Sequence, residues 1–355
     1  MPLPSPAFWS GKRVLVTGHT GFKGGWLTLW LNAMGAKTHG FALSPAIAPS
    51  MFQAADVANG MDSSTIGDIR DRRSLSEAIS RAAPEIVFHL AAQPLVRDSY
   101  ERPTETFEVN VMGVVHLLEA VRSTAGIKAL VNVTTDKCYE NKEWPWGYRE
   151  HEPMGGRDPY SSSKGCAELV TAAYRESFLA AAGVGVATAR AGNVIGGGDW
   201  AKDRLVPDIF RALDSNTPLT IRSPEATRPW QHVLEPLCGY LLLAEHLCTE
   251  GGAFAESWNF GPGEDDTETV RWMVERLVSR YPAVAWSTGS ADNPHEANYL
   301  KLDSSKARTR LGWRPRWRLA AALAKTSEWH EAWRRGQDMN AVTLSQIAEY
   351  SRRDG

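Results

Sequence analysis

The sequence predicts an α/β protein built on a doubly wound parallel sheet, followed by a smaller C-terminal substrate-binding lobe. Three observations predict this fold class. Short apolar, β-branched runs alternate with segments of helical spacing, no two such runs are joined as a hairpin, and a glycine-rich turn follows the first run. Continuous apolar runs are typical of strands that helices cover on both faces of a sheet.

The expected elements follow one another regularly in the first half of the chain. Strands are expected at Lys12–Gly18, Thr38–Leu43, Glu85–Ala91, Ala129–Thr134 and Gly185–Ala191. Helices are expected at Gly21–Gly35, Ser74–Ala83, Thr104–Ser123 and Tyr160–Ala182. Beyond about Ile195 the alternation weakens, and Gly, Pro, Trp and Arg become dense. We therefore expect a sheet domain over residues 8–195, a lobe over residues 196–340 and a peripheral tail over residues 341–355.

Composition limits the partners that this chain can have. Lys and Arg total 39 against 41 Asp and Glu, a formal net charge of −2, which does not indicate a nucleic-acid or membrane-surface binder. The four cysteines form no CxxC pair and no zinc-like spacing, so we expect free thiols, no disulfide framework and no metal site. No apolar run approaches the roughly 18 residues of a membrane span. A soluble cytoplasmic protein is expected.

The segment from Thr17 to Gly24 is a candidate phosphate loop. Gly18, Gly21 and Gly24 are spaced GxxGxxG between the first strand and the first helix. Glycines permit the tight turn and a close backbone approach, and the helix N-terminus presents free N–H groups to a pyrophosphate. We therefore predict a Rossmann-type domain over residues 8–195 in which this loop, including Thr20, Phe22 and Lys23, binds a dinucleotide.

The residues that would hold the adenosine half are less typical. An acidic residue about 20 positions past the loop usually binds the ribose hydroxyls, but this region reads Phe41-Ala42-Leu43-Ser44-Pro45. Ser44 supplies at most one hydrogen bond, and no Arg is present to bind a 2′-phosphate, so NAD is favoured over NADP. Asp68 suits an adenine amino group; the alternative is a helix N-cap, for which Asp71 is the better candidate.

Tyr160 and Lys164 are candidate catalytic residues. They lie four positions apart at the start of an expected helix, so their side chains face the same way. A tyrosine with its ordinary pKa near 10 is a poor base, but a neighbouring ammonium and an oxidised nicotinamide both favour the phenolate. The expected strand Ala129–Thr134 is followed by Thr135-Asp136-Lys137 at the carboxyl edge, where such sheets bind ligands.

These motifs carry a resemblance to a known family. TGHTGFKG, GDIRD, HLAAQ, TTDK, DPYSSSK, RAGNVIGG, RPWQHVL, WNFGP and LGWRP occur in this order, and the chain resembles the extended short-chain dehydrogenases that act on nucleotide sugars. Nucleotide-sugar 4,6-dehydratases carry Thr-Asp-Glu where this sequence has Thr135-Asp136-Lys137. The Asp-Lys variant, Lys23 and the aromatic segment from Lys137 to Glu152 are similar to the CDP-glucose branch.

The resemblance implies a reaction and a role for each catalytic residue. Tyr160, supported by Thr135 and Lys164, removes the 4-hydroxyl proton while hydride passes from carbon 4 to NAD⁺. Water is then lost across carbons 5 and 6, with Asp136 placed to protonate the departing hydroxyl, and hydride returns to carbon 6. The expected product is CDP-4-keto-6-deoxyglucose, a deoxysugar precursor of the kind used for lipopolysaccharide O-antigen.

The resemblance also implies binding residues and an assembly. The cofactor set adds Ile69, Ala91 and Ala92 to the loop, Asp68 and the Tyr160–Lys164 pair. The expected substrate-binding residues are Gln93, Asn193, Arg204, Arg228, His295 and Tyr299, although surface ion pairs remain an alternative for the two arginines. The helices at Thr104–Ser123 and Tyr160–Ala182 each carry an apolar stripe, and the matching helices in this family form a four-helix bundle. A homodimer or homotetramer is expected.

Lys137 is assigned the base for the carbon 5 proton. This hypothesis requires the neutral amine, which Lys164, the positive nicotinamide ring and desolvation would favour. The alternative is that Lys137 stays charged, stabilises the enolate and orients Asp136. Three other functions remain open at this point: a dehydratase for another nucleotide, a 4-epimerase, which would need no acid such as Asp136 at carbon 6, and a catalytically silent NAD-sensing protein.

Overall fold

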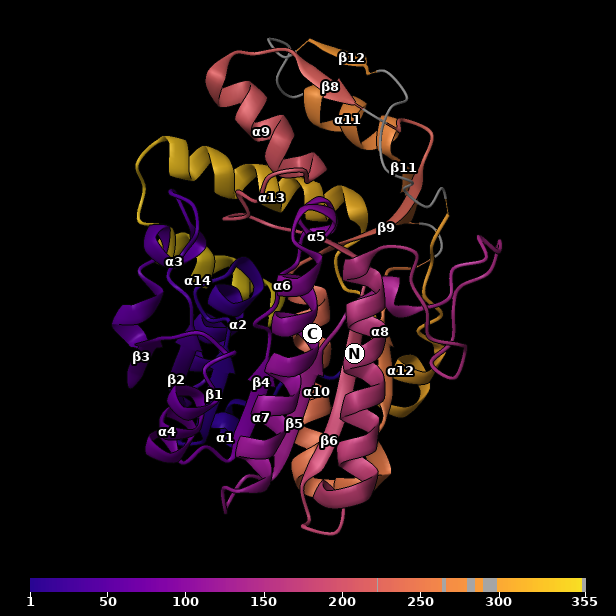
Figure 1. The fold of residues 1–355 in the computed structure, drawn as a ribbon. Coiled ribbons are helices and arrows are strands. Elements are labelled where there is room, and N and C mark those ends of the chain that lie inside the picture. Colours follow the sequence, from indigo (N-terminus) through magenta and orange to yellow (C-terminus); the bar gives the residue numbers. More distant parts are fainter. Residues whose placement is uncertain (222, 264–265, 280–284, 290–298, 353–355) are drawn as a thin grey trace.

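The computed structural model describes residues 1–221, 223–263, 266–279, 285–289 and 299–352. Its centre is a seven-stranded sheet in which every strand pairs with its neighbours in parallel (Figure 1). In spatial order the strands are β10 (Ser257–Phe260), β6 (Gly185–Ala191), β5 (Ala129–Val133), β4 (Ile86–His89), β1 (Arg13–Thr17), β2 (Lys37–Ala42) and β3 (Ser63–Ile66). The order reverses between β1 and β4, and such a switch point is where doubly wound sheets bind ligands at their carboxyl edge.

Helices cover both faces of the sheet, as expected for strands that are apolar on each side. Val14 and Val16 of β1 belong to one hydrophobic core, whereas Leu15 between them belongs to another. Successive side chains of a strand point to opposite faces, so this alternation assigns the two cores to the two faces. The first core contains α2 (Phe22–Ala33) and α10 (Leu234–Glu250); the second contains α4 (Arg72–Ala82), α7 (Gly113–Arg122) and α8 (Pro159–Tyr174).

Each predicted strand and helix of the first half is present within a few residues of its predicted ends. The helix expected at Thr104–Ser123 consists of α6 (Pro103–Phe107), the π-helical turn η2 (Glu108–Met112) and α7. The helix expected from Tyr160 onward is α8 extended by a second π-helical turn, η4 (Arg175–Leu179). Sequence analysis missed β3, which is short and largely exposed, and β10, which comes from the second half of the chain.

The second half contributes to the sheet domain as well as to a separate lobe. β10 pairs with β6, and most residues of α10 are buried, so residue 195 is not a clean boundary. The lobe lies above the carboxyl edge in Figure 1. Its elements are β7 (Asn193–Ile195), β8 (Leu219–Ile221), β9 (Thr227–His232), β11 (Thr267–Thr269), β12 (Trp286–Thr288), α9 (Leu205–Ser215) and α11 (Val270–Val278).

The C-terminal part of the chain is not wholly peripheral. Helix α13 (Leu319–Arg334) is followed by α14 (Met339–Tyr350), which contacts α2. Tyr350 is fully buried, and its hydroxyl donates a hydrogen bond to Oε2 of Glu235 at 2.7 Å. The expectation of a peripheral tail over residues 341–355 was therefore wrong for this helix. Its buried Ile347 and Tyr350 belong to the core that contains α2 and α10.

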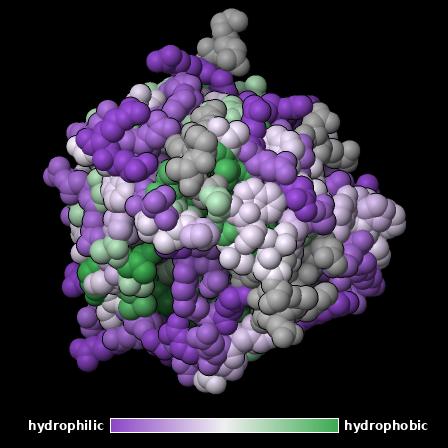
Figure 2. All heavy atoms as spheres, turned by 90° about the horizontal axis from the view of Figure 1, so that it is seen from above, coloured by the Kyte–Doolittle hydropathy of each residue, from purple (hydrophilic) through white to green (hydrophobic). Residues whose placement is uncertain are grey.

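The remaining short elements lie in connections, namely α1 (Pro6–Trp9), α3 (Met51–Ala54), α5 (Val96–Glu101), α12 (Ser305–Arg310), η1 (Val57–Gly60), η3 (Asp136–Cys138) and η5 (Gly251–Phe254). Seen from above, the end of the molecule that carries the lobe is mostly hydrophilic, with separate hydrophobic patches (Figure 2). Among the described helices, none combines the length and the apolar character needed to cross a membrane.

Candidate active site

The glycine loop is packed so tightly that Gly18 and Gly24 are required. Gly18 has φ +78°, and a Cβ there would lie 2.7 Å from the backbone nitrogen of Ala91. A Cβ on Gly24 would lie 2.0 Å from the carbonyl oxygen of Gly18. Gly21 is the N-cap of α2 and makes no side-chain capping bond, so the first N–H groups of this helix are available to an anion. The loop thus fits the pyrophosphate of a dinucleotide.

The residues expected near adenosine have local partners. Both carboxylate oxygens of Asp68 accept hydrogen bonds from Arg70, at 2.8 Å from its backbone N–H and at 2.9 and 2.6 Å from its guanidinium. The side-chain bond to Arg70 lowers the pKa of Asp68. Asp71 is the N-cap of α4, as predicted. Ile69 is buried against Gly113 of α7, and Ser44 is exposed.

The catalytic candidates converge between the end of β5 and the start of α8. Asp158 caps α8 by accepting a hydrogen bond from the backbone N–H of Ser161 at 2.9 Å. This start places Tyr160 in a side-chain hydrogen bond with Thr135. One turn later, Nζ of Lys164 donates to the carbonyl oxygen of Val133 at 3.3 Å. Tyr160 and Lys164 are 8% and 6% exposed.

Asp136 is the most enclosed acid of this group. It is 1% exposed, and its Oδ1 accepts a hydrogen bond from the Thr135 hydroxyl at 3.0 Å. Its Oδ2 is buried and has no hydrogen-bond partner within the described part of the chain. Nζ of Lys137 lies 3.7 Å from Oδ1, and the Lys137 side chain is 32% exposed. A buried oxygen without a protein partner fits a group that meets a substrate hydroxyl.

Burial is the largest influence on the pKa values of Tyr160, Lys164 and Lys23. It raises the pKa of Tyr160 to about 12, although the hydrogen bond with Thr135 opposes this shift. Burial lowers the pKa of Lys164 to about 8 and that of Lys23 to about 7; Arg204 and Lys164 add to the shift at Lys23. The isolated protein therefore holds Tyr160 protonated, and a bound positive ring would favour its phenolate.

A cavity of about 590 Å³ joins these residues to the lobe. Several predicted residues line it, namely Lys23, Thr135, Asp136, Lys137, Tyr160, Asn193, Arg204 and Arg228. Nη1 of Arg204 donates to Oδ2 of Asp199 at 2.9 Å. An apolar section with Leu205, Val206, Leu219 and Ile221 lies in the lobe. The cavity thus has a polar reactive end, cations for a diphosphate and an apolar end for a base.

Two predicted substrate residues, Gln93 and Tyr299, are absent from the lining of this cavity. The Gln93 amide bonds within its own loop, donating to the Leu95 carbonyl oxygen and to the Thr106 hydroxyl, both at 3.0 Å. The Gln93 side chain therefore stabilises its own loop, and it is absent from the cavity lining. The Tyr299 hydroxyl donates to the Pro145 carbonyl oxygen at 3.0 Å, while its neighbour Leu300 lines the cavity. His295 lies outside the described residues.

Sequence analysis missed Asp199 and did not predict that Lys23 lines this cavity. Asp199 lines the cavity and pairs with Arg204; its one signal was the sequence Gly196-Gly197-Gly198-Asp199 immediately after β7. Lys23 was assigned to the cofactor, but the structure also places it in the substrate cavity, where Asp136 and Arg204 act on its charge.

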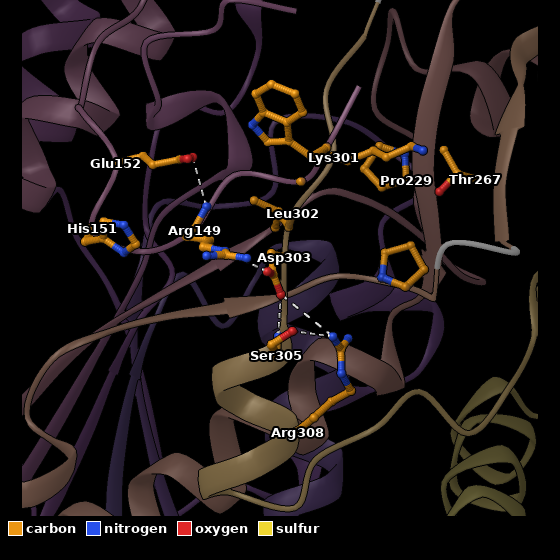
Figure 3. A pocket seen from close by; sticks show the side chains of 13 residues that line it. Arg149, His151, Glu152, Pro229, Thr267, Lys301, Leu302, Asp303, Ser305 and Arg308 are labelled. Carbon is orange, nitrogen blue, oxygen red and sulfur yellow. Dashed lines mark hydrogen bonds and ion pairs between the residues drawn. The ribbon is translucent and has the colours of Figure 1, made fainter. Parts of the chain in front are cut away.

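A second cavity, of about 460 Å³, is lined by Arg149, Asp303, Ser305 and Arg308 among other residues (Figure 3). Arg149 and Arg308 meet at Asp303, with N–O distances of 3.0 and 3.7 Å, and Ser305 accepts a further bond from Arg308 at 2.6 Å. Both arginines of this second cavity are thus paired with the carboxylate of Asp303, and we assign no ligand to the cavity.

The parallel sheet with its glycine loop, and a buried Thr135–Tyr160–Lys164 group at its carboxyl edge, define a protein of the extended short-chain dehydrogenase class. A family model described as GDP-mannose 4,6 dehydratase matches residues 15–326. The chain therefore belongs to this family of nucleotide-sugar 4,6-dehydratases.

Individual relatives and solved structures agree with this assignment. CDP-glucose 4,6-dehydratase of Salmonella typhimurium is 56% identical over 349 residues, which cover 97% of each chain. dTDP-glucose 4,6-dehydratase of Streptomyces antibioticus is 28% identical and covers 74% of this chain and 75% of its own. The structure of DesIV, a dTDP-glucose 4,6-dehydratase from Streptomyces venezuelae with NAD and TYD bound, has a TM-score of 0.76 at 24% identity, covering 92% of this chain and 98% of that one. This last likeness shows the shared fold.

Proposed function

We propose that this chain converts CDP-glucose to CDP-4-keto-6-deoxyglucose and water, with NAD as a cofactor that is regenerated in each cycle. The observation that carries the proposal is the buried Asp136 with its unpartnered Oδ2, placed beside the hydrogen-bonded Thr135–Tyr160 pair. The base preference is supported by the 56% identity to the Salmonella typhimurium CDP-glucose 4,6-dehydratase.

The residues divide the reaction between them. Tyr160, hydrogen-bonded to Thr135, accepts the proton of the sugar 4-hydroxyl. NAD, when held by the glycine loop and the start of α2, would supply the hydride acceptor for carbon 4 and the hydride donor for carbon 6. Lys137 removes the carbon 5 proton once carbon 4 is a ketone, and Asp136 protonates the departing 6-hydroxyl. Asn193, Arg204 and Arg228 line the cavity where the diphosphate would be held, with Asp199 orienting Arg204.

A panel of substrates tests the function. Purified protein with NAD is given CDP-, dTDP-, GDP- and UDP-glucose, and the 4-keto product is measured. Turnover with CDP-glucose at least tenfold faster than with the others is expected. Preference for another nucleotide would overturn the base assignment. Conversion to the 4-epimer without a ketone product would overturn the dehydratase assignment.

The choice of NAD over NADP is part of this proposal. The exposed Ser44 follows β2, and the glycine loop and the uncapped start of α2 fit a pyrophosphate without distinguishing the two dinucleotides. Titration with both is expected to give tighter binding of NAD. Tighter binding of NADP would mean that a basic residue outside the Ser44 turn captures the 2′-phosphate.

A homo-oligomer, cytoplasmic localisation and a role in deoxysugar supply for lipopolysaccharide O-antigen complete the proposal. Large apolar side chains are exposed on α6, η2, α8 and η4, namely Phe107 (37%), Met112 (46%), Leu169 (61%) and Phe178 (44%). Such a group of exposed apolar residues supports a contact with a second copy through these helices. A homodimer requires one such contact, and a homotetramer requires a second interface.

A further inference from the structure

A buried ion pair lies one helical turn beyond Lys164, outside the cavity lining. Glu168 is 4% exposed and Arg190 of β6 is 2% exposed. The guanidinium donates to both carboxylate oxygens, from Nε to Oε1 at 2.9 Å and from Nη2 to Oε2 at 2.8 Å. Burying two charges costs desolvation energy that their attraction scarcely repays, so a pair of this kind is weak evidence for stability alone.

The carboxylate holds the end of β5 in the same way as Lys164 does. Lys164 donates to the carbonyl oxygen of Val133 at 3.3 Å, and Glu168 accepts a hydrogen bond from the hydroxyl of Thr134. Residues i and i+4 of α8 therefore contact successive residues of the strand end. Thr135, the next residue, bonds to Tyr160. These contacts fix Lys164 relative to the Thr135–Tyr160 pair.

The other end of the pair is satisfied by neighbouring segments. Nη1 of Arg190 donates to the Tyr139 hydroxyl at 2.6 Å and to the carbonyl oxygen of Glu150 at 3.0 Å. The Tyr139 hydroxyl donates in turn to Oδ1 of Asn259 at 2.7 Å. A fully bonded buried network of this kind has one well-defined arrangement, so it holds Glu168 in place.

The charge of Glu168 acts directly on Lys164. Burial lowers the pKa of Lys164 to about 8, and Glu168 is the largest opposing influence, followed by Cys138 of η3. The other titratable groups that act with Lys164 are Lys23 of α2 and His89 of β4. Burial lowers the pKa of His89 to about 3, so this imidazole is neutral.

We propose that Glu168, held by Arg190, is a positioning residue that keeps the Lys164 ammonium charged and seated against the end of β5. The inference rests on the proposed catalytic role of Lys164. This positioning role explains why the Glu168 carboxylate is buried one helical turn beyond Lys164, outside the cavity lining. Without the Glu168 carboxylate, Lys164 would lose its proton at a lower pH and would be free to leave the Val133 carbonyl.

The effect of Glu168 on the charge of Lys164 is tested by the pH profile of kcat/KM with CDP-glucose and NAD. In the double variant Glu168→Gln/Arg190→Gln neither member of the ion pair is left charged without the other, and the alkaline limb is expected to move to lower pH by about one unit. This is about a tenfold loss of activity on that limb. Ser257→Ala is the matched control, because it removes only a neutral hydrogen bond of 3.3 Å to Glu168, and its profile should match the wild type. Glu168→Asp should restore the alkaline limb.

The effect of Glu168 on the position of Lys164 against the end of β5 is tested independently by Thr134→Val, which removes the hydroxyl bound to Glu168. A fall in kcat of at least fivefold with an unchanged KM is expected. A folded double variant with the wild-type alkaline limb would overturn the electrostatic half, and wild-type kcat in Thr134→Val would overturn the seating half. If the wild type itself forms no ketone from CDP-glucose, the proposed function fails, whereas an active wild type with unshifted variants contradicts the positioning role alone.

Discussion

Lys137→Ala is expected to separate the two halves of the proposed reaction. Lys137 is partly exposed, and its Nζ lies 3.7 Å from Asp136 Oδ1. When the partly exposed Lys137 side chain is removed, the buried Asp136 keeps the hydrogen bond that it accepts from the Thr135 hydroxyl. The Thr135–Tyr160 hydrogen bond and the bond from Lys164 to Val133 do not involve the Lys137 side chain. The variant should therefore fold and retain the first hydride transfer.

The loss falls on the elimination step. A positioned general base contributes about 10²–10⁴-fold, which corresponds to roughly 3–5 kcal/mol of activation free energy. Overall turnover of Lys137→Ala should fall at least a hundredfold, while NADH absorbance rises after CDP-glucose is added and stays high. Incorporation of solvent deuterium at carbon 5 should be lost to the same extent.

Lys137→Arg distinguishes a base from a fixed charge. Arginine keeps the positive charge beside Asp136 but does not accept a proton at neutral pH. If Lys137 is the base, Lys137→Arg should be as slow as Lys137→Ala; if it only stabilises the enolate, the arginine variant should recover most of the rate. Turnover of Lys137→Ala at near the wild-type rate would refute any catalytic role for this residue.

Three further predictions concern hydride transfer, assembly and stability. Tyr160→Phe should form NADH from CDP-glucose at least a hundredfold more slowly in a single turnover, and a wild-type rate would exclude Tyr160 as the base. Leu169→Glu should lower the molar mass measured by light scattering, whereas Ile66→Glu, at a 53% exposed position on β3, should not; an unchanged mass in both would place the interface elsewhere. Burial raises the pKa of Glu235 to about 7, above its ordinary 4.5, so the folded protein keeps a proton that the unfolded chain releases as the pH rises through this window. Wild-type unfolding free energy should fall relative to Glu235→Gln by up to about 1.4 kcal/mol per pH unit from pH 4.5 to 7, and a constant difference in denaturant titrations would contradict this.

The sequence by itself determined the local elements and the common face of two candidate catalytic residues. Alternation of apolar strands with amphipathic helices predicted five of the sheet strands within a few residues. This worked because the side-chain repeats of a strand and of a helix depend only on residues that are close together in the sequence. The i, i+4 spacing of Tyr160 and Lys164 likewise fixed their common face once a helix began at Pro159. The three glycines of the loop predicted the tight packing now seen between Gly18, Gly24 and Ala91.

Only the tertiary structure decided which distant segments meet. The pairing of β10 with β6 and the burial of Tyr350 against Glu235 join residues whose local patterns are compatible with several neighbours. The choice among these neighbours is made by burial of apolar area and by satisfaction of buried polar groups, which are properties of the whole packed chain. For the same reason the sequence named Lys23 as a cofactor residue but did not reveal that its side chain also lines the cavity.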